Sequence, residues 1–203
     1  MKSEFTRREL LGRTSIYGAG ISLAMASGLP LAQGAAAASS KPASLDDAQW
    51  CTLEAMTGRL IPSGKTPGAV EANCVNFIDK ALAHEEQSAA SMVREGVTLL
   101  DSHCQANWHK PFCKLRPDQQ DALLRGLEDG EISSWPADAE PSSQFFGYVR
   151  ALTIMGFLAD PKYGGNRAFG GWQVAGYPGP RHHRGGYTNA QMMGEEDIVP
   201  IWE

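Results

Sequence analysis

The sequence has no excess of basic residues, few signs of β-strand alternation, and no strongly apolar run long enough for a stable membrane span. Its 203 residues include 18 Lys and Arg against 23 Asp and Glu, a formal net charge of −5. An acidic chain lacks the positive surface that neutralises phosphates, which argues against nucleic-acid binding. There is no C-x-x-C-H motif, so no covalently attached c-type haem is expected. With 42% hydrophobic residues, the composition favours one folded domain over a disordered or collagen-like chain.

Residues 1–37 have the layout of an export signal. A basic start is followed by a weakly apolar run over residues 16–31 and then by a cluster of small residues. Residues 6–11 contain the pair Arg7 and Arg8 before an apolar stretch and resemble the twin-arginine export motif. An ordinary Sec signal with two chance arginines is the alternative. Because the twin-arginine pathway carries folded proteins, the passenger can bring along a cofactor or a partner without its own signal.

Apolar residues recur at helical spacing through the next part of the chain. Ser44 is predicted to cap the first helix, with Asp47 facing back, and Pro67 to lie in the first turn of the second. The sequence therefore predicts an all-α fold, a single small bundle of about five helices within residues 38–159. The predicted helices cover about residues 44–61, 67–81, 87–107, 117–130 and 142–157.

Residues 160–203 differ in character because glycines and aromatic residues are closely interspersed up to residue 188. This glycine content predicts no regular helix, and so many aromatic side chains require a surface to pack on. The segment is expected either to fold back on its own bundle or, the favoured interpretation, to extend across another protein. Residues 194–203 end in an apolar stretch that also calls for a binding surface.

Four cysteines follow the signal, and an oxidising compartment after export would permit disulfides. The favoured pairs are Cys51 with Cys74, which would lie on neighbouring helices if residues 62–67 form a tight hairpin, and Cys104 with Cys113. Other pairings or a bond to a partner chain remain open. An alternative reads His103, Cys104, His109 and Cys113 as metal ligands of a stand-alone periplasmic metalloprotein or enzyme. Their spacing matches no common structural zinc site.

Several short motifs resemble the gluconate 2-dehydrogenase subunit 3 family, and the resemblance covers roughly residues 45–180. The most specific block runs from a Tyr-Gly-Gly-Asn to a Gly-Tyr-Pro-Gly sequence. The motifs occupy residues 60–62, 67–69, 77–79, 160–166, 171–172 and 176–179.

The resemblance implies a small, or gamma, subunit of a periplasmic sugar or sugar-acid dehydrogenase complex that is associated with the inner membrane. In such complexes a large subunit holds FAD and a multihaem cytochrome c subunit passes electrons to the quinone pool. The small subunit is expected to hold no cofactor and no catalytic residue. It would instead escort the signal-less flavoprotein through twin-arginine export and stabilise it.

On this reading the segment after Asp160 forms the partner interface. Its glycines would allow close backbone approach, its aromatic residues would supply contact area, and Asn166 would hold a turn through side-chain bonds to the backbone. The predicted interface residues are Asp160, Tyr163, Gly164, Gly165, Asn166, Gly171, Trp172, Gly176, Tyr177, Pro178 and Gly179.

The basic run at residues 181–184 matches no family motif, and it is expected to be either a solvated turn or a charged contact with the partner.

A further alternative concerns the signal at residues 1–37. If it is not cleaved, the chain would be a membrane-tethered binding protein. The substrate of the complex would be set by the flavoprotein, so it cannot be read from this chain.

Overall fold

A computed structural model describes residues 42–180 and 186–198, and these residues form helices and connecting turns without any strand. The all-α prediction is confirmed. The predicted signal at residues 1–37 and the basic run at 181–184 lie outside the described residues. The α-helices are α2 (Asp47–Leu60), α3 (Cys74–Ala83), α4 (Ala90–Trp108), α5 (Pro117–Asp129), α6 (Ser142–Leu158), α7 (Gly170–Ala175) and α8 (Asn189–Met192). Short 3-10 turns occur at η2 (Gln87–Ala89), η3 (Phe112–Lys114), η4 (Pro161–Tyr163) and η5 (Arg167–Phe169).

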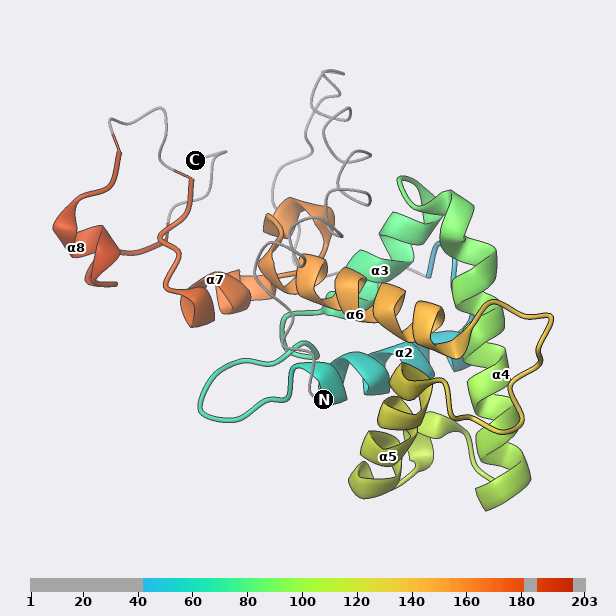
Figure 1. Cartoon of the computed structure of the whole chain (residues 1–203). Coiled ribbons are helices and arrows are strands. Elements are labelled where there is room, and N and C mark those ends of the chain that lie inside the picture. The colour runs from blue at the N-terminus through green and yellow to red at the C-terminus, as the bar shows by residue number, and fades with distance from the viewer. Residues whose placement is uncertain (1–41, 181–185, 199–203) are drawn as a thin grey trace, which may run out of the picture.

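Helices α2 to α6 pack into one bundle, and α7 and α8 extend from one end of it (Figure 1). Helices α2 and α6 each contact the other four helices, so these two form the centre of the bundle. A single continuous core joins all five helices. Close packing reaches the backbone at Gly96 of α4, where an added Cβ atom would overlap the ring of Phe145. The largest side chains that are almost wholly buried include Leu53, Met56, Ile78, Leu82, Val93, Val97, Leu100, Leu127, Phe145 and Leu152.

Three of the predicted helices begin or end where the sequence signals indicate. Pro117 opens α5, where its missing N–H group costs no hydrogen bond, and Gly130 ends that helix in the left-handed conformation at φ 75°. Helix α6 begins at Ser142 as predicted, and α4 follows the short turn at Gln87–Ala89.

The predicted start of the first helix is wrong by two residues. Asp46, not Ser44, is the N-cap of α2, and its carboxylate accepts a hydrogen bond from the Gln49 backbone at 2.8 Å. The Gln49 side chain in turn accepts from the Asp46 N–H group, so the two residues form a reciprocal capping box.

Ser44 lies instead in a segment that is bound to α3. The backbone N–H groups of residues 43–45 all donate to the carboxylate of Asp79, with N···O distances of 2.7 to 2.9 Å. Asp79 is only 3% exposed. The guanidinium of Arg94 also donates to the Ser44 hydroxyl, at 3.1 Å. This buried carboxylate therefore fixes the start of the described chain to the bundle.

The prediction that the second helix begins at Pro67 is also wrong. Residues 69–73 form turns, and α3 begins only at Cys74, after Asn73 in the left-handed conformation at φ 59°. A Cβ atom on Gly68 would lie 2.6 Å from the Ile61 carbonyl oxygen, so the chain passes close to the end of α2 before α3 starts. The residues predicted to form the first turn of the second helix, from Pro67 onward, form this connection instead.

Candidate functional site

The segment after α6, predicted as the partner interface, folds back against the C-terminal part of α6. Asn166 is completely buried and joins the two. Its amide donates to the Ala159 carbonyl at 2.8 Å, and its side-chain oxygen accepts from the Gly171 N–H group at 2.8 Å. The role predicted for Asn166, holding the turn through side-chain bonds to the backbone, is therefore observed.

Two glycines of the predicted interface make their closest contacts within this chain. An added Cβ atom on Gly165 would overlap the carbonyl oxygen of Gly156, and one on Gly171 would overlap that of Phe157. Both carbonyl groups belong to α6. These glycines therefore allow the returning backbone to pack directly on the helix backbone, where no side chain fits.

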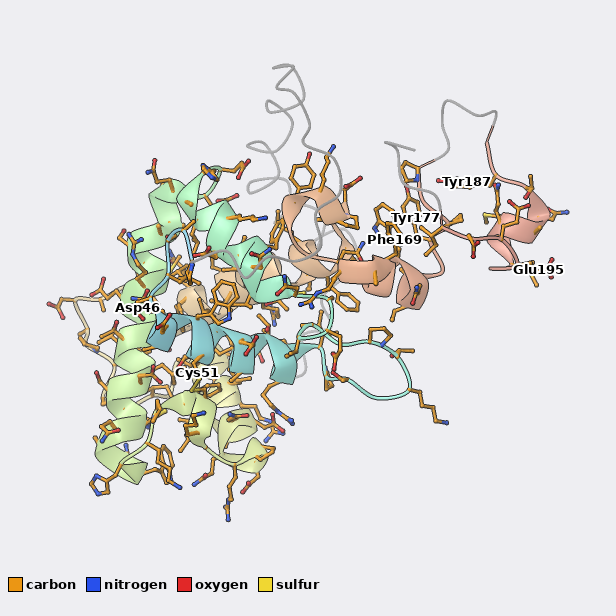
Figure 2. All side chains as sticks on the ribbon, turned by 180° about the vertical axis from the view of Figure 1, so that it is seen from behind. Asp46, Cys51, Phe169, Tyr177, Tyr187 and Glu195 are labelled. Carbon is orange, nitrogen blue, oxygen red and sulfur yellow. A yellow bond between two sulfur atoms is a disulfide. The ribbon has the colours of Figure 1, made fainter. Side chains whose placement is uncertain are left out.

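Trp172 also has an internal role. Its side chain is 5% exposed, and its indole N–H donates to the Leu158 carbonyl at 2.8 Å, near the end of α6. Its ring stacks on Phe169, with 5.5 Å between centroids, and meets Tyr177 edge-on at 5.0 Å. The aromatic residues therefore form a cluster of their own at this end of the molecule (Figure 2).

The expectation that this glycine-rich segment contains no regular helix is wrong. Residues 170–175 form the short helix α7, which Gly176 ends in the left-handed conformation at φ 65°. The turn before it holds Asn166, Ala168 and Phe169 at positive φ. Hydrogen bonds and close packing on α6 therefore impose a helix that local propensity disfavours.

An open apolar groove lies beside this segment, between α3 and α6. It has a volume of about 610 Å³. Ile154 and Leu158 of α6 are 48% and 44% exposed in spite of their apolar side chains. We call this surface the α3–α6 groove; its main lining residues are Phe77, Lys80, Leu152, Ile154, Leu158 and Tyr163.

Charged residues surround the apolar floor of the α3–α6 groove. Lys80, Glu85 and Asp160 line it, and the Lys162 ammonium lies 5.0 Å from the centre of the Tyr163 ring. Burial raises the pKa of the Asp160 carboxyl, although the Lys162 backbone N–H donates to it at 3.0 Å. An apolar centre with a charged rim is the usual composition of a surface that binds another protein.

The predicted interface residues Asp160 and Tyr163 thus lie on the groove, whereas Ile154 and Leu158 were not predicted. A signal for them exists in the sequence. Residues 152–158 are apolar on several sides of the helix, and such a helix is in contact on more than one face.

A second cavity of about 500 Å³ lies between α7 and the residues around α8. It is lined by Phe169, Trp172 and Tyr177 on one side and by Glu196 on the other. Burial, together with the neighbouring Tyr187, raises the pKa of Tyr177 to about 12. Of the remaining predicted interface positions, Gly164 is half-buried, and its carbonyl accepts from the Asn76 amide of α3 at 2.7 Å. Gly176 is exposed, whereas Pro178 and Gly179 are buried.

The predicted disulfide pairs, 51–74 and 104–113, are both wrong. The structure joins Cys51 of α2 to Cys113 of η3, whereas Cys74 and Cys104 are free and buried. The prediction assumed a tight hairpin after α2. The chain instead makes a longer turn that directs Cys74 toward Ala69, Ala72 and Phe157, and Cys104 lies on the inner face of α4.

The alternative metal site is not assembled by this fold. Cys113 is bonded to Cys51, and Cys104 is buried in the core. His103 lies 2.6 Å from the Ser134 hydroxyl, and His109 ends α4 in the left-handed conformation. Across the described residues, no three His, Cys, Asp or Glu side chains come together as a metal site would require.

These features define a class of protein: an all-helical unit whose C-terminal segment packs on its own helix α6 and which has an exposed apolar groove. The chain belongs to the gluconate 2-dehydrogenase subunit 3 family, whose model matches residues 47–179. No curated protein and no solved structure matches the chain. Within residues 42–180 and 186–198, no helix combines the length and apolar character needed to cross a membrane.

Proposed function

We propose that this chain is the small, non-catalytic subunit of a periplasmic FAD-dependent dehydrogenase of the gluconate 2-dehydrogenase type. The large partner subunit holds FAD, and a multihaem cytochrome c subunit carries electrons toward the membrane quinone pool. This chain escorts the signal-less flavoprotein through twin-arginine export and stabilises it afterwards. Membership of a family described as a dehydrogenase subunit supports the existence of partners.

The observation that carries the proposal is the α3–α6 groove. Ile154 and Leu158 are about half exposed and lie in one groove, so a single partner surface can cover both. Burying an exposed Leu or Ile side chain contributes about 1.5–3 kcal/mol. We assign the groove to the flavoprotein subunit. Because Asp160 and Tyr163 line the groove, the predicted interface segment contributes one of its walls.

The placement of FAD on the partner is consistent with the architecture of this chain. Dinucleotide-binding folds place the cofactor at the edge of a parallel sheet. Residues 42–180 and 186–198 contain only helices, turns and connecting segments. In this proposal the chain contributes a binding surface, the α3–α6 groove, to the complex.

Purification of the affinity-tagged chain from the periplasm of its own host tests the proposal. We expect a flavin-containing large subunit to co-purify with it, together with acceptor-dependent dehydrogenase activity. The double variant Ile154→Asp/Leu158→Asp places two charges in the groove and is expected to lose at least about nine-tenths of the bound flavin.

The matched control is Met192→Asp/Met193→Asp on α8. These methionines are 63% and 75% exposed, more than the two groove residues, but they lie outside the groove. The control should keep the flavin. If the wild-type chain purifies without a flavoprotein, or if both double variants retain it equally, the proposal is wrong.

Export is tested separately by the double variant Arg7→Lys/Arg8→Lys. If this chain escorts its partner, both proteins should disappear from the periplasm together. A flavoprotein that still reaches the periplasm at the wild-type level would contradict the escort role and leave the binding role standing.

A further inference from the structure

The four cysteines fall into two classes in the folded chain. Cys74 and Cys104 are both 0% exposed, and burial raises the pKa of each thiol to about 12. Because the thiolate is the reactive form, these two side chains are protected from disulfide exchange. Cys51 and Cys113 are only partly buried, and their Cα atoms lie 5.8 Å apart.

One carboxylate holds the residues next to both members of the bonded pair. Asp101 of α4 accepts from the Thr52 hydroxyl at 2.9 and 3.1 Å and from the Phe112 N–H group at 2.8 Å. Thr52 directly follows Cys51, and Phe112 directly precedes Cys113. Helix α4 thus holds the Thr52 side chain next to Cys51 and the Phe112 backbone next to Cys113, and neither contact involves a sulfur atom.

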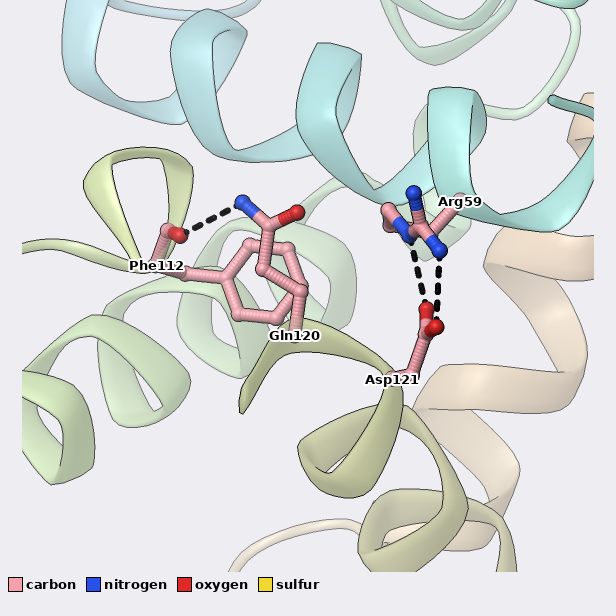
Figure 3. A network of polar contacts seen from close by, with 4 residues as sticks. All are labelled: Arg59, Phe112, Gln120 and Asp121. Atoms are coloured by element: carbon pink, nitrogen blue, oxygen red, sulfur yellow. Dashed lines mark hydrogen bonds and ion pairs between the residues drawn. The ribbon is translucent and has the colours of Figure 1, made fainter. Parts of the chain in front are cut away.

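The η3 turn that carries Cys113 has further support. The Phe112 side chain is completely buried, and its carbonyl accepts from the Gln120 amide of α5 at 3.0 Å (Figure 3). Nearby, Arg59 and Asp121 join α2 to α5 through two hydrogen bonds of 2.7 Å each (Figure 3). The position of η3 between its neighbours therefore depends on contacts that do not require an oxidised chain.

We propose that the chain folds completely in its reduced form and that Asp101 holds the Cys51 and Cys113 thiols side by side, so that the disulfide closes only after folding and only at this pair. Asp101 is a positioning residue for the oxidation. One consequence rests on the proposed function: a chain exported in the folded state can pass through the reducing compartment without its disulfide and acquire it afterwards.

The reaction is ordinary thiol–disulfide exchange with an external disulfide as the oxidant. One thiolate of the pair attacks the oxidant, forms a mixed disulfide and releases one thiol. The second thiolate then attacks the mixed disulfide, closes the 51–113 bond and releases the other thiol. The two cysteines lose two protons and two electrons in total, and the oxidant disulfide is reduced to two thiols.

The test uses the full chain after signal removal, without any partner, so its outcome is independent of the proposed function. The reduced protein should show the same near-ultraviolet circular dichroism as the oxidised protein. On addition of oxidised glutathione in native buffer, peptide mapping should find the 51–113 bond alone. Two thiols should remain unreactive toward a thiol reagent until denaturant is added.

Asp101→Ala should slow closure of the mixed disulfide about tenfold or more, because it removes the acceptor that aligns the two segments. Asp101→Asn keeps one side-chain oxygen as acceptor and should restore most of the rate. Arg59→Met is the control for general destabilisation, since it removes the α2–α5 ion pair and leaves both contacts of Asp101. Its closure rate should stay close to that of the wild type.

The double variant Cys51→Ser/Cys113→Ser keeps the proposal testable if Asp101→Ala fails to fold, and it should retain the native spectrum. Three results would overturn the proposal. They are an unfolded reduced chain, a mixture of pairings formed in native buffer, and an Asp101→Ala closure rate equal to that of Arg59→Met.

Discussion

The bundle of α2 to α6 and the segment after α6 reach a packed state by different means. In the bundle, side chains interlock between helices, and even the close approach at Gly96 is to the ring of Phe145. In the segment after α6, backbone meets backbone at Gly165 and Gly171. Of the five non-glycine residues at positive φ in the described chain, three lie within residues 166–169. Such conformations cost about 1–2 kcal/mol each, so a few specific contacts must hold this segment in place.

This difference indicates that the sequence motif at residues 160–179 serves largely to fold the segment onto α6. Its asparagine, two of its glycines and its tryptophan bind α6, and in doing so they place Asp160 and Tyr163 beside the groove. In the bundle a substitution can be accommodated by a shift of neighbouring side chains. At Gly165 and Gly171 the neighbours are backbone carbonyl oxygens of α6, which cannot shift without distorting the helix.

The largest effect on stability is expected from Gly171→Ala, in the segment after α6. The new methyl group would overlap the Phe157 carbonyl oxygen, which cannot move without distorting α6. We expect a loss of about 3 kcal/mol in the free energy of unfolding, measured by urea denaturation with tryptophan fluorescence.

The matched control is Gly147→Ala, in the neighbouring helix α6, where no atom lies within 4 Å of the added Cβ atom. It should stabilise the chain by about 0.5–1 kcal/mol through helix propensity. If the two substitutions change stability by the same amount, backbone contact is not what holds the segment.

A smaller effect is expected from Asp79→Asn, in helix α3 of the bundle. The amide keeps one acceptor oxygen where the carboxylate offers two to the N–H groups of residues 43–45, so we expect a loss of about 1–3 kcal/mol. Hydrogen exchange at these three amides should accelerate at the same time.

Asp118→Asn is the control for Asp79→Asn, because Asp118 forms an exposed ion pair with Arg116, in which the side chains are 67% and 73% exposed respectively. It should change stability by less than about 0.5 kcal/mol. Equal losses in the two variants would show that Asp79 does not hold the start of the domain.

The smallest effects concern the pH dependence of stability. The pKa shifts of Asp121 in the bundle and Asp160 in the segment after α6 should have opposite signs. Hydrogen bonds from Arg59 lower the pKa of Asp121 in the bundle, so its contribution is present above the unfolded pKa and is lost as pH falls through the folded pKa. Burial raises the pKa of Asp160, so the folded state binds the proton more tightly and protonation of Asp160 favours folding. Carboxyl NMR titration should place Asp121 below and Asp160 above the ordinary value of about 3.9; the reverse order would contradict both structural explanations.

The sequence predicts the bundle well because its signals are local and repeated. Apolar spacing and the residues Pro117, Gly130 and Ser142 identify helices that the structure confirms. The start of α3 and the disulfide pairing could not be predicted in the same way. Both depend on the path of residues 61–73, which is fixed by the close passage of Gly68 at the end of α2.

The candidate site shows the same limit. The role of Asn166 followed from its residue type, but the internal use of Gly165, Gly171 and Trp172 did not, since glycines and aromatics suit a partner surface equally well. Helix α7 depends on contacts with α6 that local propensity does not encode. The α3–α6 groove arises only when two helices far apart in sequence are packed together.

The most direct measurement of the central claim is site-specific photo-crosslinking in the host periplasm. A photoreactive amino acid is placed at Ile154 in the groove or, for comparison, at Met193 on α8. We expect the Ile154 position to crosslink to the FAD-containing large subunit and the Met193 position not to do so. Crosslinking only from Met193, or from neither position while the complex is present, would contradict the assignment of the groove to the flavoprotein.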